Sequence, residues 1–342
     1  MMPGEACMEG RDGGRPRTVG HSAPADSVPA NWPNRAASRM LEAGGCRWHL
    51  QRMGRGPGML LVHGTAASTH TWRDLMPRLA RSWDVLAVDL PGHGFSGRLP
   101  GGSMALPSLA DGLGELLDTV PFEPVVAVGH SAGAAVLLEM ALDGLIEPAQ
   151  IIGLNAALKP FDGHLQRFFS PLARAISGSR AIAALLARRA RDPDAITRLL
   201  EGTGSFPDAR GIELYGYLLS DPDRVGSVLA MMAQWDLHGL QARLEQLRTQ
   251  LCLVAARGDQ AVPPGEARET ARRVPGARVV IQERGGHLAH EEFPEATAEI
   301  IEAVCAQVPG CGPGAGGAGS GSASDGEIRK AGNCGSVLGR GD

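Results

Sequence analysis

The chain has 342 residues, of which 43% are hydrophobic and 20% are charged, and its formal net charge is −4. This length suits one large α/β domain, or a core domain that carries an insertion. A mildly acidic chain without a clustered basic face has no electrostatic footprint for nucleic acid, so nucleic-acid binding is excluded. There is no apolar run of about 18 residues for a transmembrane segment and no secretory signal pattern, so we expect a cytoplasmic protein.

The two ends of the sequence differ from its middle. Residues 1–35 are rich in Gly, Pro and charge, and residues 309–342 are dominated by Gly and Ser. Such segments cannot bury enough apolar surface to offset the entropy of ordering, so both are predicted to be disordered tails. The six cysteines show no C-x-x-C pair and no zinc-binding spacing, so neither a metal site nor a disulfide framework is predicted. They are Cys7, Cys46, Cys252, Cys305, Cys311 and Cys334.

The middle of the chain begins with a predicted antiparallel hairpin over residues 38–54, which turns at Gly44 and Gly45. Short apolar runs then alternate with longer helical patterns, which is typical of a parallel sheet covered by crossover helices. Strands are predicted at 59–62, 84–88, 124–128, 150–154, 250–255 and 278–282. Helices are predicted at 71–81, 108–120, 132–144 and 293–308.

The alternation stops between residues 156 and 235, where several helix-like segments occur without a convincing strand. We interpret this stretch as a helical cap inserted into a core formed by residues 36–155 and 236–308. Ligands of open α/β sheets bind beyond the carboxyl ends of the strands, so a cap at that edge would cover the site. Met231, Met232 and Trp235 lie at helical spacing in the cap and are better explained as core residues than as a cofactor box.

Gly129-His130-Ser131-Ala132-Gly133 matches the G-x-S-x-G pattern of a nucleophile elbow. In a chain with 47 glycines the pattern alone is weak. Its context carries the weight, because a predicted strand precedes it and a predicted helix follows it, as the elbow requires. Ser131 is therefore the candidate nucleophile, and an ordinary glycine-rich turn is the alternative.

A serine nucleophile needs a base, and the base needs an orienting carboxylate. Asp259 follows the strand at 250–255 and His287 follows the strand at 278–282, which places both at the same edge of the sheet as Ser131. A turn aspartate and a solvated loop histidine are the alternative interpretations of these two residues. His290 competes as the base, but its neighbours favour a role at the start of a helix. After the strand at 150–154 the chain offers Asn155 in place of an acid, which strengthens Asp259.

The tetrahedral intermediate of acyl transfer needs hydrogen-bond donors for its oxyanion. The backbone N–H of Ala132 is one candidate, and the N–H of Thr65, in the loop "HGTAAS", is the other. Gly64 allows that loop to come close, and His63 is expected to shape the loop by hydrogen bonding. Asp89 and His93 in "DLPGHGFS" are expected to be structural turn residues.

With these elements in place, residues 36–308 resemble the α/β-hydrolase superfamily: a mostly parallel sheet flanked by helices, with an inserted helical cap. Within it the chain is similar to the magnesium-chelatase accessory proteins of bacteriochlorophyll biosynthesis. The stretches that carry this similarity include "HGTAASTHTWRDL", "VGHSAGAAVLLEMALDG", "FFSPLAR" and "EGTGSFPDARGIELYGYLL". Cap segments carry most of the family identity, since core motifs are shared among unrelated specificities.

The resemblance implies a role near magnesium insertion into protoporphyrin IX, beside the ATP-using chelatase. It implies a porphyrin-related small-molecule substrate or chelatase subunits as partners, and a cytoplasmic location or peripheral attachment to the photosynthetic membrane. The chain has no G-x-x-x-x-G-K-[ST] loop and no aspartate-rich metal motif, so it is not the motor, and no cofactor is predicted.

Three hypotheses follow from the sequence. The first is a serine hydrolase of the pigment pathway, and the second is a non-catalytic factor whose apolar cap binds porphyrin or a chelatase subunit. The third is a general esterase or carbon–carbon hydrolase unrelated to pigment. A dehalogenase or epoxide hydrolase would carry Asp as the nucleophile, so Ser131 disfavours both.

Overall fold

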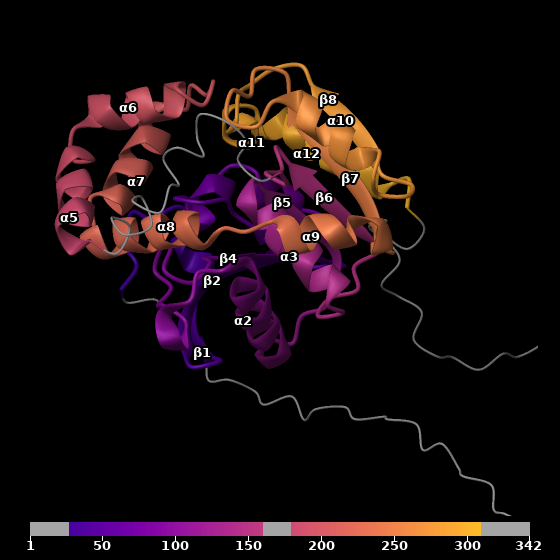
Figure 1. Ribbon diagram of the computed structural model, residues 1–342, viewed down its shortest axis with the longest axis horizontal. Helices are drawn as coiled ribbons and strands as arrows, with labels where there is room; N and C mark the ends of the chain where they lie inside the picture. The colour runs from indigo at the N-terminus through magenta and orange to yellow at the C-terminus, as the bar shows by residue number, and fades with distance from the viewer. Residues whose placement is uncertain (1–26, 160–178, 309–342) are drawn as a thin grey trace, which may run out of the picture.

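The computed structural model describes residues 27–159 and 179–308 (Figure 1). Residues 1–26, the tail at 309–342 and the cap stretch "FFSPLAR" lie outside the described residues. The predicted end of the first tail at residue 35 is wrong, because Val28 and Trp32 are only 2% and 4% exposed. They pack with Met40 and Phe95 and with the cap. These two apolar contacts order residues 27–35, although the composition of the first 35 residues is typical of a disordered tail.

One eight-stranded sheet forms the centre of the fold, in the order β1-β2-β4-β3-β5-β6-β7-β8. The strands from β3 onwards pair in parallel, whereas β2 pairs antiparallel with both β1 and β4. Every strand predicted from the apolar runs is present, including the hairpin, whose turn residues Gly44 and Gly45 have φ of 58° and 69°. The strands are β1 (Ser38–Ala43), β2 (Cys46–Gly54), β3 (Gly58–Val62), β4 (Asp84–Val88), β5 (Pro124–His130), β6 (Gln150–Leu154), β7 (Gln250–Ala256) and β8 (Arg278–Gln282).

Helices cover both faces of the sheet, as the apolar pattern on both sides of the strands requires. Leu60 and Val62 of β3 face α2 (Leu106–Thr119), α3 (Ala132–Leu142) and α9 (His238–Arg243), while Met59 and Leu61 face α1 (Met76–Leu79) and α12 (Pro294–Cys305). The remaining core elements are α10 (Pro264–Ala271), α11 (Ala289–Glu292) and the 3-10 turns Arg35–Ala37, Thr69–Trp72, Pro100–Gly102 and Leu244–Gln246.

The predicted helix at 71–81 is wrong as one element. The chain forms a 3-10 turn at Thr69–Trp72 and the short α1, with Pro77 in its first turn. Pro77 has no N–H to donate to the carbonyl of Arg73, so a continuous helix cannot close across this point.

Among the described residues, four helices between β6 and β7 form the cap and group to one side of the sheet (Figure 1). They are α5 (Arg180–Arg189), α6 (Pro193–Glu201), α7 (Ala209–Leu219) and α8 (Pro222–Gln234). Each begins where the sequence supplies an N-cap, because a Ser or Asp side chain accepts a hydrogen bond from a backbone N–H of the first turn. These cap residues are Ser179, Asp192, Asp208 and Asp221.

A buried ion pair joins the cap to the core. Arg73, which follows the 3-10 turn, pairs with the fully buried carboxylate of Glu291 in α11 and with Asp208 at the start of α7. Glu291 also accepts hydrogen bonds from Tyr215 of α7 at 2.8 Å and from Thr71 at 2.6 Å. The cap is therefore bound to the core through a carboxylate, that of Glu291, which is fully buried.

We predict that Arg73→Met destabilises the protein by about 3–5 kcal/mol, because the substitution leaves the carboxylate of Glu291 buried without its cation. Urea denaturation measures the loss. The matched control is Arg257→Met, which removes an ion pair with Glu283 on the surface and should leave stability almost unchanged. Equal stabilities for the two variants would contradict a stabilising role of the buried pair.

Candidate active site

Ser131 occupies a strained turn between β5 and α3. Its φ of 51° and ψ of −117° are a conformation that residues other than glycine rarely adopt. A side chain on Gly133 would place its Cβ 2.6 Å from the carbonyl oxygen of His63, and a Cβ on Gly129 would lie 2.5 Å from the amide of Ala134. Both flanking glycines are therefore required by close packing, and they allow the Ser131 side chain to stand partly exposed at the strand end.

Asp259 and His287 are brought together by the loops after β7 and β8. Oδ2 of Asp259 lies 2.9 Å from Nδ1 of His287, and the Asp259 side chain is fully buried while that of His287 is 12% exposed. The other oxygen, Oδ1, accepts hydrogen bonds from the amides of Ala261 and Val262, both at 2.8 Å. The carboxylate is thus saturated with donors and holds the imidazole with its Nε2 directed away from the acid.

Asn155 completes this network and was missed as a functional candidate. Its Nδ2 donates to Asp259 Oδ2 at 2.6 Å and to the carbonyl of Gly286 at 3.0 Å, and its Oδ1 accepts from the amide of Ala256 at 3.2 Å. Its place in the sequence could have indicated this role, because Asn155 directly follows β6 at the sheet edge where Ser131, Asp259 and His287 lie. Asn is among the few residues that adopt a left-handed φ, here 47°, with little strain.

The Ser131 turn lies beside the His287 loop and the loop after β3. His130 donates from Nε2 to the carbonyl of His287 at 2.9 Å, and the two rings are 4.7 Å apart. On the other side, a Cβ built on Gly64 would lie 2.9 Å from the Cβ of Ser131, so the "HGTAAS" loop passes directly over the serine. In the described part of the chain, neither Ser131 Oγ nor His287 Nε2 has a hydrogen-bond partner.

The two amides predicted to bind an oxyanion lie in these loops. Thr65 follows Gly64, and its hydroxyl donates to the sulfur of Met231 in the cap at 3.7 Å. Ala132 is the first residue of α3. Neither backbone N–H of this pair has a protein acceptor within the residues that the structure describes. Met231 is completely buried and belongs to the core, as its spacing predicted, whereas Met232 and Trp235 are half-buried.

The other polar residues noted in the sequence have structural contacts. His63 donates from Nδ1 to the carbonyl of Gly64 at 2.7 Å and accepts from the amide of Leu90, which fixes the loop as predicted. Asp89 is buried and accepts from His49 and from the amides of Thr69 and Phe95. The His49 imidazole keeps the pKa of the Asp89 carboxyl below its usual range despite burial.

His290 does not lie in the position of a base. It is 2% exposed, and its Nε2 is 2.7 Å from the hydroxyl of Thr71. Its ring packs on His130 at 4.4 Å, so it supports the ring beneath the Ser131 turn. Burial lowers the pKa of His290 and of His130 well below the usual range, so both rings are neutral at pH 7.

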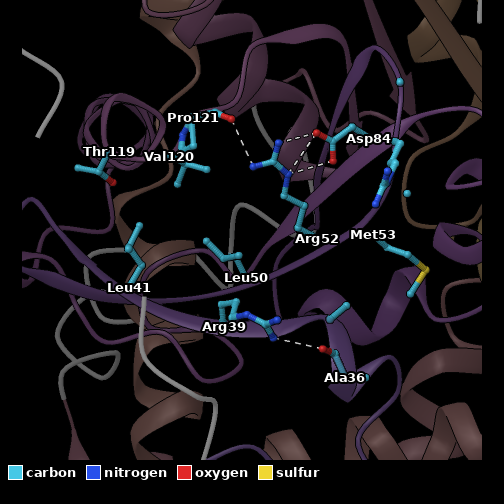
Figure 2. Close-up of a pocket in the computed structure, with 14 residues that line it drawn as sticks. Ala36, Arg39, Leu41, Leu50, Arg52, Met53, Asp84, Thr119, Val120 and Pro121 are labelled. Carbon is cyan, nitrogen blue, oxygen red and sulfur yellow. Dashed lines mark hydrogen bonds and ion pairs between the residues drawn. The ribbon is translucent and has the colours of Figure 1, made fainter. Parts of the chain in front are cut away.

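A hollow of about 640 Å³ lies at the β1–β2 corner of the sheet (Figure 2). Arg39 and Arg52 border it together with Leu41, Leu50 and Val120. Arg52 is held by Asp84 and by the carbonyl of Pro121, as the dashed lines show (Figure 2). None of the predicted site residues lines this hollow, so it is not part of the candidate site.

Residues 27–159 and 179–308 contain neither a clustered metal site nor a membrane-spanning helix. No group of three or more His, Cys, Asp or Glu in these ranges is arranged to hold a metal ion. None of their helices combines the length and apolarity needed to cross a membrane.

The mostly parallel eight-stranded sheet, with a serine elbow after β5, is the architecture of an α/β hydrolase. The chain belongs to the alpha/beta hydrolase family, whose sequence profile matches residues 59–300. It is 36% identical over 277 residues to the magnesium-chelatase 30 kDa subunit of Rhodobacter capsulatus, covering 80% of this chain and 96% of that protein. The family resemblance predicted from the motifs is thereby confirmed.

The chain is also similar to two more distant proteins. It is 27% identical over 256 residues to the pyrrolizixenacetamide deacetylase of Xenorhabdus hominickii, with coverage of 71% of this chain and 88% of that one. A solved alpha/beta hydrolase fold protein from Burkholderia ambifaria superposes with a TM-score of 0.64 at 24% identity, over 75% of this chain and 94% of that chain. The second comparison shows the fold alone.

We predict that Gly133→Ala destabilises the protein by about 3 kcal/mol, the upper range for overpacking, because its Cβ would collide with backbone carbonyls. Gly239→Ala is the matched control. Gly239 also lies in a helix, but nothing stands within 4 Å of its added Cβ, so that variant should gain about 0.5–1 kcal/mol. Urea denaturation separates the two, and similar effects would disprove the steric argument.

We predict that the free energy of unfolding falls as the pH drops below about 6.5. Burial lowers the pKa of His93 to about 4 and of His70 to about 3, and it lowers those of His130 and His290 as well. Below about pH 6.5 the rings are protonated in the unfolded chain but stay neutral in the folded chain. Each ring therefore lowers the free energy of unfolding by about 1.4 kcal/mol per pH unit. Denaturation at pH 7 and pH 5 should differ accordingly, and equal values would contradict the prediction.

Proposed function

We propose that this protein is a serine hydrolase that cleaves an ester or amide by acyl transfer. Ser131 is the nucleophile, His287 the general base and acid, and Asp259 the residue that orients the imidazole. The observation that carries the proposal is the bond between Asp259 Oδ2 and His287 Nδ1, beside the strained turn that presents Ser131. Strain at a position fixed by packing is a frequent property of functional sites.

The chemistry follows from the atoms left without protein partners. Nε2 of His287 removes the proton of Ser131 Oγ as the oxygen attacks the carbonyl carbon of the substrate. The negative charge that develops on the carbonyl oxygen is stabilised by the N–H groups of Thr65 and Ala132. His287 then returns the proton to the leaving alcohol or amine, and water releases the acyl group from Ser131 by the same steps. Throughout, Asp259 keeps the Nδ1 proton in place and stabilises the imidazolium.

The biological setting is proposed from the relationship to the magnesium-chelatase 30 kDa subunit. We place the protein in bacteriochlorophyll biosynthesis, as an accessory factor to magnesium insertion into protoporphyrin IX. Its substrate would be a small porphyrin-related ester, and the chelatase subunits would be its partners, in the cytoplasm or at the surface of the photosynthetic membrane. The more distant relative named as a deacetylase supports acyl cleavage by this family of folds.

One observation favours a second candidate function. The chain is similar to a protein named as a chelatase subunit over 96% of that protein's length. A non-catalytic factor that binds porphyrin or a chelatase subunit would show the same similarity. A general esterase or carbon–carbon hydrolase outside the pigment pathway would instead retain the chemistry and lose the partners.

We predict that a fluorophosphonate probe labels the wild-type protein and labels neither Ser131→Ala nor His287→Ala. The probe's phosphorus bonds to Ser131 Oγ as fluoride leaves, and this step requires His287 to accept the hydroxyl proton. Ser220→Ala is the matched control, because its hydroxyl donates to the carbonyl of Tyr217 at the end of α7, away from the candidate site.

The outcomes separate the candidate functions. Labelling that is lost only in the two site variants supports the hydrolase and directs the search to ester substrates. Labelling that survives in Ser131→Ala refutes this nucleophile. Well-folded wild-type protein that takes no label refutes the hydrolase, and binding of protoporphyrin IX or of chelatase subunits then becomes the leading account.

A further inference from the structure

The link between α6 and α7 enters the site from the cap side. The carbonyl oxygen of Thr203 accepts hydrogen bonds from the amide of Gln260, next to the acid, at 3.1 Å and from the amide of His287 itself at 3.3 Å. This carbonyl of the cap therefore joins the loop that carries Asp259 (the acid loop) to the loop that carries His287 (the base loop). Such a bridge holds the separation of the two loops from outside the core.

Ser205 makes the second contact of this link. It is completely buried, and its hydroxyl oxygen accepts from the amide of Leu288, the residue after the base, at 2.8 Å. The hydroxyl of Thr203 donates to the same oxygen at 3.0 Å. Since a buried N–H without an acceptor is costly, the Leu288 amide depends on this cap side chain.

Glu292 of α11 closes the link from the core side. Its Oε1 accepts from the amide of Phe206 in the cap, and its Oε2 from the amide of Gly286 before the base, both at 2.9 Å. The backbones meet without room for side chains, because a Cβ on Gly286 would lie 2.6 Å from the amide of Ser205. Gly204 likewise packs on the carbonyl of Gly258. The cap link and the base loop thus fit as one unit.

We propose that residues 203–206 are a positioning element for His287, so that the cap sets the geometry of the base in addition to covering the site. Thr203 and Ser205 act through the base loop and touch no substrate in this account. Without the link, residues 286–288 would lose two hydrogen bonds, those donated by the amides of His287 and Leu288. The catalytic meaning of this inference rests on the proposed hydrolase, but the positioning itself is measurable without it.

The test is Ser205→Ala, compared with Ser227→Ala. Ser227 is a cap serine that is equally buried, and its hydroxyl bonds within its own helix to the carbonyl of Asp223. We expect Ser205→Ala to slow fluorophosphonate labelling between about 10- and 100-fold, because a displaced base loses its alignment with Ser131. We also expect a shifted pH profile of labelling and faster hydrogen exchange at the Leu288 amide. Ser227→Ala should change none of these, even if it loses comparable stability.

A second variant guards against misfolding of the first. Glu292→Gln keeps one acceptor and loses the other, so it should speed exchange at the amide of Gly286 or Phe206 and slow labelling less than Ser205→Ala. Glu295→Gln, which changes an exposed carboxylate paired with Arg78, is its control.

Each result decides the inference. A folded Ser205→Ala variant with wild-type labelling, pH profile and Leu288 exchange overturns it. If wild-type protein takes no label, the proposed hydrolase fails, and the positioning element is then judged by Leu288 exchange and by the NMR titration of His287. Changes confined to Ser205→Ala support it in that case, and wild-type values overturn it.

Discussion

The contact on which the rest of the site depends is the approach of α3 to the end of β3. Gly133 lies against the carbonyls of Val62 and His63, closer than any side chain would permit. This packing forces Ser131 into its strained turn and draws Gly64 over it, so the serine and the loop after β3 are fixed by one contact. Strain of this kind costs about 1–3 kcal/mol. The first nine residues of α3 are buried, and their apolar contacts offset that cost.

The cap is part of the same construction. Apolar packing of α7 on Trp32, the buried pair of Arg73 with Glu291, and the 203–206 link join it to three separate parts of the core. Beside Phe95, Arg224 of α8 donates to the carbonyl of Gly94 at 2.7 Å. A cap attached at so many points cannot turn as a rigid body without breaking buried hydrogen bonds. Its described helices are therefore expected to stay fixed on the core and not to open as a hinged lid.

The sequence was most informative where one physical pattern dominates. All the strands follow from apolar runs, and Asp259 and His287 were placed beside each other because both directly follow parallel strands. The failures are local or long-range. Pro77 split a helix that periodicity alone would continue, and a short polar helix such as α10 gave too little pattern to be predicted. The roles of Asn155 and of the cap link were not predicted, because they depend on contacts between residues far apart in the sequence. Asn155 and Asp259 are 104 residues apart, and Ser205 and Leu288 are 83 residues apart.

Asn155 also explains why the acid stands after β7. Its amide donates to Oδ2 of Asp259, the same oxygen that accepts the hydrogen bond from His287 Nδ1. A carboxylate at position 155 would lie within hydrogen-bond distance of Asp259, and two buried like charges so close would raise the pKa of one of them. An acid after β7 therefore requires a donor after β6, and the amide provides it while also holding the Gly286 carbonyl. The amide of Asn155 thus gives a second hydrogen-bond donor to the Asp259 oxygen that faces His287, where a carboxylate would give only another acceptor.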